Sequence, residues 1–288
     1  MQQSDTIEPT ESSMRRVFSP SLLVATLLAV TAAHAQTAQE RQWCESEEEV
    51  TVVQRIDGCS AVIKAGRDRS EKLAEAYSSR GLAYRLKGEY DRAIQDYGQA
   101  IKLDAKSANA YANRGVAYDN KGEYDRAIQD YDQAIKLKPS VEVYFNRGNA
   151  YLGKGQHDHA IDDYNQALKL KPDFAAALDN RCWARAVVGV LRQALADCNE
   201  ALRLMPNNAA TLDSRGFVFL KLTQFDAAVS DYDAALRANP KRAFALYGRG
   251  LARLKNADAS GEADIAEAKA LQSDIAEEYA RYGIQGVR

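Results

Sequence analysis

The sequence lacks several features that common active sites and binding sites require. Its 38 lysines and arginines nearly balance 40 aspartates and glutamates, so no excess of positive charge is available to neutralise nucleic-acid phosphates. Of three histidines, His157 and His159 lie two positions apart, a spacing that does not place both on one helix face around a metal ion. No glycine-rich loop follows a predicted strand. The sequence therefore predicts a non-enzymatic protein with no catalytic residues, metal, cofactor or nucleic-acid partner.

Long hydrophobic runs are also scarce, and the clearest one lies near the N-terminus. It spans 17–33, follows two arginines and ends in an A-x-A sequence, which is the arrangement of a secretory signal peptide. We expect residues 1–35 to be removed before Gln36, with Met14 as an alternative start. An uncleaved membrane anchor is the other interpretation, although the run is short and contains a proline. Cleavage predicts a protein without a membrane span, in the periplasm of a Gram-negative bacterium or secreted.

What the sequence has in abundance is a repeat of 33 or 34 residues, marked by an Arg-Gly pair. The pairs are Arg80-Gly81, Arg114-Gly115, Arg147-Gly148, Arg215-Gly216 and Arg249-Gly250, with Arg181-Cys182 in the same phase. The unit 108–140 shows the pattern most simply. It predicts one amphipathic helix, a turn at Gly122, and a second amphipathic helix that Pro139 ends. One hairpin cannot bury its apolar face alone, so the hairpins are expected to stack.

This unit resembles the tetratricopeptide repeat (TPR). The residues that carry the resemblance are Tyr111, Gly115, Tyr118, Ala127, Tyr131 and Pro139. The resemblance implies an all-α solenoid, a right-handed superhelix of antiparallel helix hairpins whose first helices line a concave face. We expect a degenerate capping hairpin at 36–73, a C-terminal cap and tail at 275–288, and six repeats between them. The expected repeats are 74–107, 108–140, 141–174, 175–208, 209–242 and 243–274.

Export changes the interpretation of the four cysteines, which allow three pairings. In a hairpin that turns near Gly189, Cys182 and Cys198 are about equally far from the turn and face each other. Cys44 and Cys59 are spaced almost identically in the capping hairpin. We therefore predict disulfides 44–59 and 182–198. The alternative is two reduced, buried pairs, because a free cysteine packs as a small hydrophobic residue.

The arginine before each glycine departs from the TPR pattern, in which leucine is usual. Five repeats also carry an aspartate in the second helix, and these are Asp96, Asp130, Asp163, Asp197 and Asp231. The two columns predict ion pairs within or between hairpins, each adding little if partly exposed. A row of arginines that binds an anionic ligand is the alternative.

The resemblance implies that side chains of the first helices contact a partner. An asparagine column can donate and accept hydrogen bonds to a peptide backbone without reading its sequence, and aromatic residues farther along are typical anchors. The candidate contact residues are Asn113, Asn146, Asn149, Asn180, Trp183, Asp213 and Phe217. In the alternative interpretation the C-terminal cap folds over some of the aromatic residues, Phe217 among them, and makes them core.

These features together predict a non-enzymatic scaffold, monomeric by default, that holds an extended or helical segment of another protein in its concave groove. Two alternatives use other surfaces or ligands. One is a docking or assembly subunit of a cell-envelope enzyme system, which would bind through the edge or convex face. The other is a cell-wall glycan-associated protein, which would stack sugars on Trp183 and Tyr247.

Overall fold

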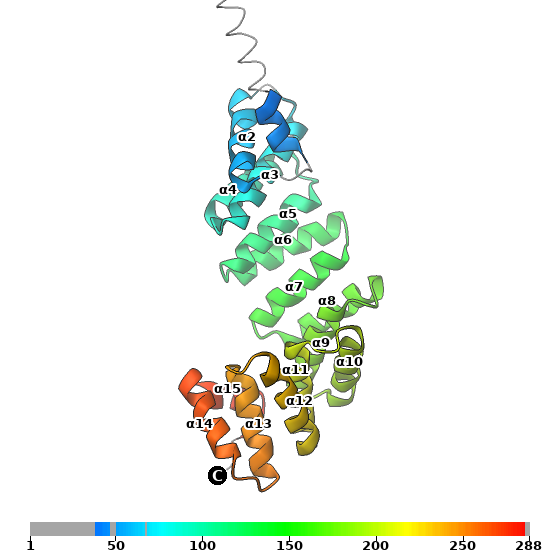
Figure 1. The fold of residues 1–288 in the computed structure, drawn as a ribbon. Helices are drawn as coiled ribbons and strands as arrows, with labels where there is room; N and C mark the ends of the chain where they lie inside the picture. Colours follow the sequence, from blue (N-terminus) through cyan, green and yellow to red (C-terminus); the bar gives the residue numbers. More distant parts are fainter. Residues whose placement is uncertain (1–37, 47–49, 67, 286–288) are drawn as a thin grey trace, which may run out of the picture.

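The computed structural model describes residues 38–46, 50–66 and 68–285, and every regular element in these ranges is helical. The signal peptide predicted at 1–35 and the alternative start at Met14 lie outside the described residues. A helical segment at 38–45 precedes the helices labelled in Figure 1, none of which is long and apolar enough to cross a membrane. These helices are α2 (Val52–Ala65), α3 (Ser70–Leu86), α4 (Tyr90–Leu103), α5 (Ala108–Asn120), α6 (Tyr124–Leu137), α7 (Val141–Gly153), α8 (His157–Leu170), α9 (Ala175–Val187), α10 (Leu191–Leu204), α11 (Ala209–Lys221), α12 (Phe225–Ala238), α13 (Ala243–Lys255), α14 (Gly261–Leu271) and α15 (Ile275–Arg281).

The helices form antiparallel hairpins that stack one after another, which confirms the expected all-α solenoid (Figure 1). The first helix of each repeat contacts the first helix of the next, from α3 and α5 through to α11 and α13. Neighbouring second helices make no such contact within the described residues. The first helices therefore lie on the inner side of the curved stack, and the face that they present is the concave one.

Each hairpin turns through a residue in the left-handed backbone region. In the first four repeats this residue is a glycine with φ between 71° and 87°, at Gly88, Gly122, Gly155 and Gly189. Repeats five and six place Thr223 and Ala257 there instead, with φ of 59° and 61°. A β-branched residue rarely adopts this conformation, so Thr223 holds a strained turn.

A glycine on the first helix and a tyrosine on the second allow the two helices of a hairpin to approach closely. A Cβ atom added at Gly115 or Gly148 would lie 2.7 Å from Cε1 of the facing Tyr131 or Tyr164. Both tyrosine rings are fully buried. The ring of one helix therefore occupies the space that a side chain of the other would need.

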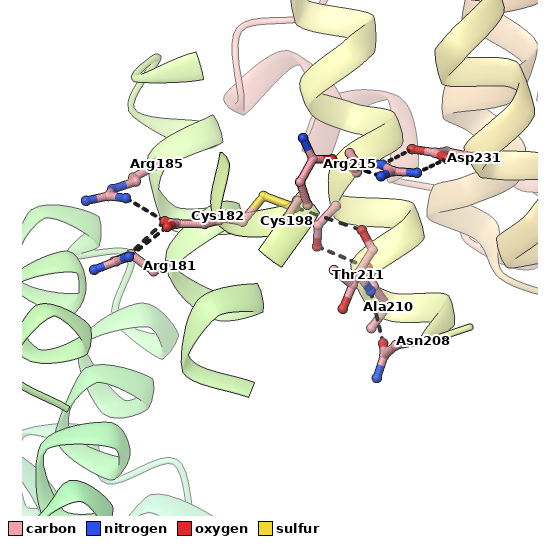
Figure 2. The surroundings of a disulfide bond; sticks show 12 residues. Arg181, Cys182, Arg185, Cys198, Asn208, Ala210, Thr211, Arg215 and Asp231 are labelled. Carbon is pink, nitrogen blue, oxygen red and sulfur yellow. Dashed lines mark hydrogen bonds and ion pairs between the residues drawn. A yellow bond between two sulfur atoms is a disulfide. The ribbon is translucent and has the colours of Figure 1, made fainter. Parts of the chain in front are cut away.

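Repeat four replaces this glycine–tyrosine pair with a disulfide. Cys182 of α9 and Cys198 of α10 are bonded, with Cα atoms 5.4 Å apart (Figure 2). Cys44 and Cys59 are bonded in the same way between the 38–45 helix and α2, with Cα atoms 4.6 Å apart. Both predicted pairings are confirmed, and no cysteine of the chain is left free.

The arginine and aspartate columns form a ladder of nearly buried ion pairs. In repeat three, Nε and Nη2 of Arg147 donate to Asp163 at 2.8 and 2.6 Å, and Nη1 donates at 2.5 Å to Asp132 of the preceding repeat. In every repeat, the arginine of the first helix donates two hydrogen bonds, through Nε and Nη2, to the aspartate of the second helix. The pairs are Arg80–Asp96, Arg114–Asp130, Arg147–Asp163, Arg181–Asp197, Arg215–Asp231 and Arg249–Asp264.

The predicted ion pairs therefore exist, and they run both within and between hairpins. The partner in repeat six, Asp264, was not among the aspartates that the sequence singled out. Because all six aspartates are buried, removal of an arginine would leave an uncompensated charge, and each pair matters more than an exposed one. Each arginine is already paired, so the column is structural rather than a row of free cations for an anionic ligand.

Candidate functional site

The predicted asparagine column lies on the first helices, along the concave face. Asn113 on α5 and Asn146 on α7 are partly buried, and neither side chain has a hydrogen-bond partner among the described residues. On α9, Nδ2 of Asn180 donates to Oδ1 of Asn149 at 2.8 Å, and the hydroxyl of Tyr164 donates to the same oxygen at 2.8 Å. The amides of Asn113 and Asn146 are therefore free to bind a peptide backbone. Those of Asn149 and Asn180 are hydrogen-bonded to each other.

The C-terminal helix α15 folds back over the far end of the concave face. Tyr279 is fully buried, its hydroxyl donates to the backbone carbonyl of Phe244 at 2.8 Å, and the two rings stack with centroids 4.3 Å apart. Just beyond the helix, the ring of Tyr282 meets Trp183 edge-on at 5.1 Å. The cap therefore covers the aromatic part of the face.

This cover corrects the role expected of two aromatic residues. Phe217 is 0% exposed and packs against Trp183, Phe244 and Tyr279, so it belongs to the core and the expectation that it contacts a partner is wrong. Tyr247 is 4% exposed and offers no open ring face on which a sugar could stack. Trp183 keeps part of its surface accessible.

A hollow of about 300 Å³ opens on the concave face, lined by residues of α9, α11 and α15 and of the start of α13. Three of the predicted contact residues line it, namely Asn180, Trp183 and Asp213. The complete lining is Asp179, Asn180, Trp183, Ala210, Asp213, Ser214, Arg242, Phe244 and Glu278. The sequence analysis missed Asp179, Arg242 and Glu278 as members of this site, although successive aspartates at one position of two repeats were a signal for the first.

The hollow is acidic, and its carboxyl groups are only partly paired. Arg242 donates through Nε to Oδ2 of Asp213, which is 2% exposed. The Oδ1 atoms of Asp213 and Asp179 are buried without a hydrogen-bond partner in the described part of the chain. Burial raises the pKa of Asp179, and it raises the pKa of Asp213 to about 6. With Glu278, three carboxyl groups therefore line a hollow that contains one guanidinium.

A larger hollow, of about 610 Å³, lies at the N-terminal end between the capping hairpin and α3. Its lining comes from residues 44–46 and 50, from α2, and from α3, which is the one repeat helix among them. It therefore involves one repeat only. Across 38–46, 50–66 and 68–285, no three His, Cys, Asp or Glu side chains are placed to hold a metal ion.

Comparison with known families identifies the repeat. The profile of the TPR repeat matches residues 81–122, and profiles of the tetratricopeptide repeat match 108–140, 141–174 and 215–278. The chain is a tetratricopeptide repeat protein. This TPR protein belongs to a class of scaffolds for protein–protein interaction, and no matching profile describes a catalytic domain. The matched ranges omit 175–214, which contains the disulfide of repeat four.

Solved structures show the same fold at low sequence identity. YrrB, described as a TPR protein with an unusual peptide-binding site, is 21% identical with a TM-score of 0.58, covering 67% of this chain and 98% of its own. PilF of Pseudomonas aeruginosa is 19% identical with a TM-score of 0.59, covering 75% and 97%. A chain of the APC/C hetero-tetramer Cut9–Hcn1 is 16% identical with a TM-score of 0.63, covering 90% and 52%. No curated protein matches the TPR chain in sequence.

Proposed function

We propose that this TPR protein is a non-enzymatic scaffold that holds an extended or helical segment of another protein along its concave face, in the periplasm or outside the cell. The observation that carries the proposal is the surface formed by Asn113 and Asn146 together with the hollow at Asn180 and Trp183. It combines unpaired amides with a recess on one continuous row of first helices.

The chemistry of this surface suits a peptide. An asparagine side chain offers both a donor and an acceptor, so it can bond to the N–H and C=O groups that every peptide backbone carries. The face is already formed by stacked, rigid hairpins, so the scaffold loses little freedom when a segment binds. The peptide-binding site named for YrrB supports the same use of the fold.

Export is supported by the way in which the cysteines are used. All four are consumed in two disulfides, and disulfides persist in the periplasm or outside the cell rather than in a reducing cytosol. The N-terminal sequence supplies a signal for that route. Protein purified from the periplasmic fraction should have the intact mass of a chain that begins at Gln36 and carries no free thiol. A product that retains residues 1–35 with reduced cysteines would contradict export.

The groove is tested by photo-crosslinking in extracts of the cell envelope. A benzophenone amino acid is placed at Asn146, on the concave face, and in a matched variant at Glu200, whose side chain is partly exposed on the second helix α10. We expect a defined adduct from the first position and none from the second. Adducts formed through Glu200 alone would instead favour docking through the convex face and would contradict binding in the groove.

A further inference from the structure

We propose that the acidic hollow between α9, α11 and α15 is a subsite for one cationic side chain, lysine or arginine, of the bound partner segment. This inference rests on the proposed function, because the cation would arrive as part of a peptide that lies along the concave face. The subsite adds a requirement to the proposed function: the partner segment must carry a lysine or an arginine at one position.

The first argument is the shortage of donors in the hollow. The Oδ1 atoms of Asp179 and Asp213 are both buried and unpaired within the described residues, and Asp213 is 2% exposed. The side chains of Ser214 and Thr211 offset part of the rise in the pKa of Asp179 by hydrogen bonding to its carboxyl group, so the missing donors are those for the two Oδ1 atoms. Arg242 reaches only Oδ2 of Asp213. A buried carboxylate oxygen without a donor is unfavourable by about 1–3 kcal/mol or more. An ammonium or guanidinium group has three or five donors and no acceptor, so it matches this need.

The second argument is the shape and composition of the walls. Trp183 and Phe244 border the hollow, with ring centroids 5.2 Å apart in an edge-on arrangement. Such aromatic walls can contact the methylene groups of a long basic side chain, and they attract its charged end. The volume of about 300 Å³ gives a single long side chain room to enter.

The third argument is the position of the hollow along the row of first helices. Asn180 at its edge occupies the same repeat position as Asn146 and Asn113, one and two repeats earlier. A peptide whose backbone bonds to the two free amides and continues along the face therefore reaches the hollow at the next repeat. Glu278 closes the far side from α15.

Binding of a cation should depend on pH in a defined direction. The charged and titratable groups around Asp213 are Asp179 on α9, Arg242 before α13, Glu278 on α15, and the hydroxyls of Tyr232 and Tyr279. The pKa values of both tyrosines lie well above 10, so neither titrates between pH 5 and 7.5. Since the pKa of Asp213 is about 6, lowering the pH protonates it and should weaken binding of a basic side chain about tenfold.

The test uses the disulfide-bonded protein and a positional library of N-acetylated, C-amidated octapeptides, whose ends carry no charge. We expect binders that are enriched in lysine or arginine at one position. The strongest binder is then compared with its norleucine analogue, which keeps the chain length and lacks the charge. We expect the analogue to bind at least about tenfold more weakly at pH 7.5, and the difference to shrink at pH 5.

The variant Asp179→Asn/Asp213→Asn should lose the basic preference. Its control, Glu200→Gln, removes a partly exposed carboxylate of α10 that pairs with Arg203 on the same helix, and it should keep the preference. Burial disfavours the charged form of both aspartates, so uncharged isosteres should be tolerated, and the pH series on the unaltered protein tests the subsite without any substitution. Binders without a basic preference would overturn the subsite and leave peptide binding intact, whereas a library with no binders would overturn both.

Discussion

Reduction of the Cys182–Cys198 disulfide should loosen repeat four and weaken the link between the two halves of the solenoid. Each repeat is stabilised mainly by its own hairpin and its immediate neighbours, so a weak repeat in the middle has consequences on both sides. The bond joins residues 16 positions apart, for which loop closure predicts a contribution of about 3 kcal/mol. Repeat four has no glycine–tyrosine contact that could take over this role.

The assay is hydrogen exchange measured by mass spectrometry on peptides from α9 and α10, with and without reductant. We expect exchange to rise about a hundredfold on reduction, the factor that corresponds to about 3 kcal/mol. The variant Cys182→Gly/Cys198→Tyr restores the pair used by the neighbouring repeats and should not respond to reductant in α9 and α10. It also controls for simultaneous opening of Cys44–Cys59. Unchanged exchange in the fully reduced natural chain would refute the reasoning.

Three further predictions concern stability. Arg147→Leu should lower the free energy of unfolding by about 3 kcal/mol because it leaves Asp163 buried without its partner, and adding Asp163→Leu should recover most of the loss in urea unfolding. Thr223→Gly should raise that free energy by about 1 kcal/mol by relieving the left-handed turn, and an unchanged melting temperature would contradict the strain. The folded-state pKa of Asp213, about 6, exceeds its ordinary value of 3.8, so the free energy of unfolding should fall by up to about 3 kcal/mol as pH rises from 4 to 7. Asp213→Asn should flatten this dependence on pH, and the same slope in both proteins would contradict the assignment to Asp213.

The fold could be predicted from the sequence because each of its main contacts repeats along the chain. The glycine and tyrosine columns mark the two helices of every hairpin, and the cysteine pairs stand at equivalent positions. The arginine and aspartate columns recur with the same period, which predicts the ion pairs between them. A contact that recurs at a fixed spacing is visible in the sequence even when its three-dimensional reason is not.

The site could be predicted only in part, because it depends on contacts that occur once. Phe217 occupies the same repeat position as Asn149 and Trp183, yet the returning α15 buries it completely. The hollow likewise needs Arg242 from a turn and Glu278 from the cap, which lie far apart in the sequence and follow no period. Asp264 shows the same limit in the ladder. It lies 15 residues after Arg249, whereas the aspartate of each of the other five pairs lies 16 residues after its arginine.

The most direct test of the account is the affinity of the crosslinked partner for a protein without the two free amides. Asn113→Ala/Asn146→Ala removes them from the concave face, and Asn207→Ala/Asn239→Ala removes two exposed amides from turns as the matched control. Loss of two hydrogen bonds predicts binding about ten- to thirtyfold weaker for the first variant and unchanged binding for the control. Full affinity of the concave-face variant would contradict the claim that this face holds the partner.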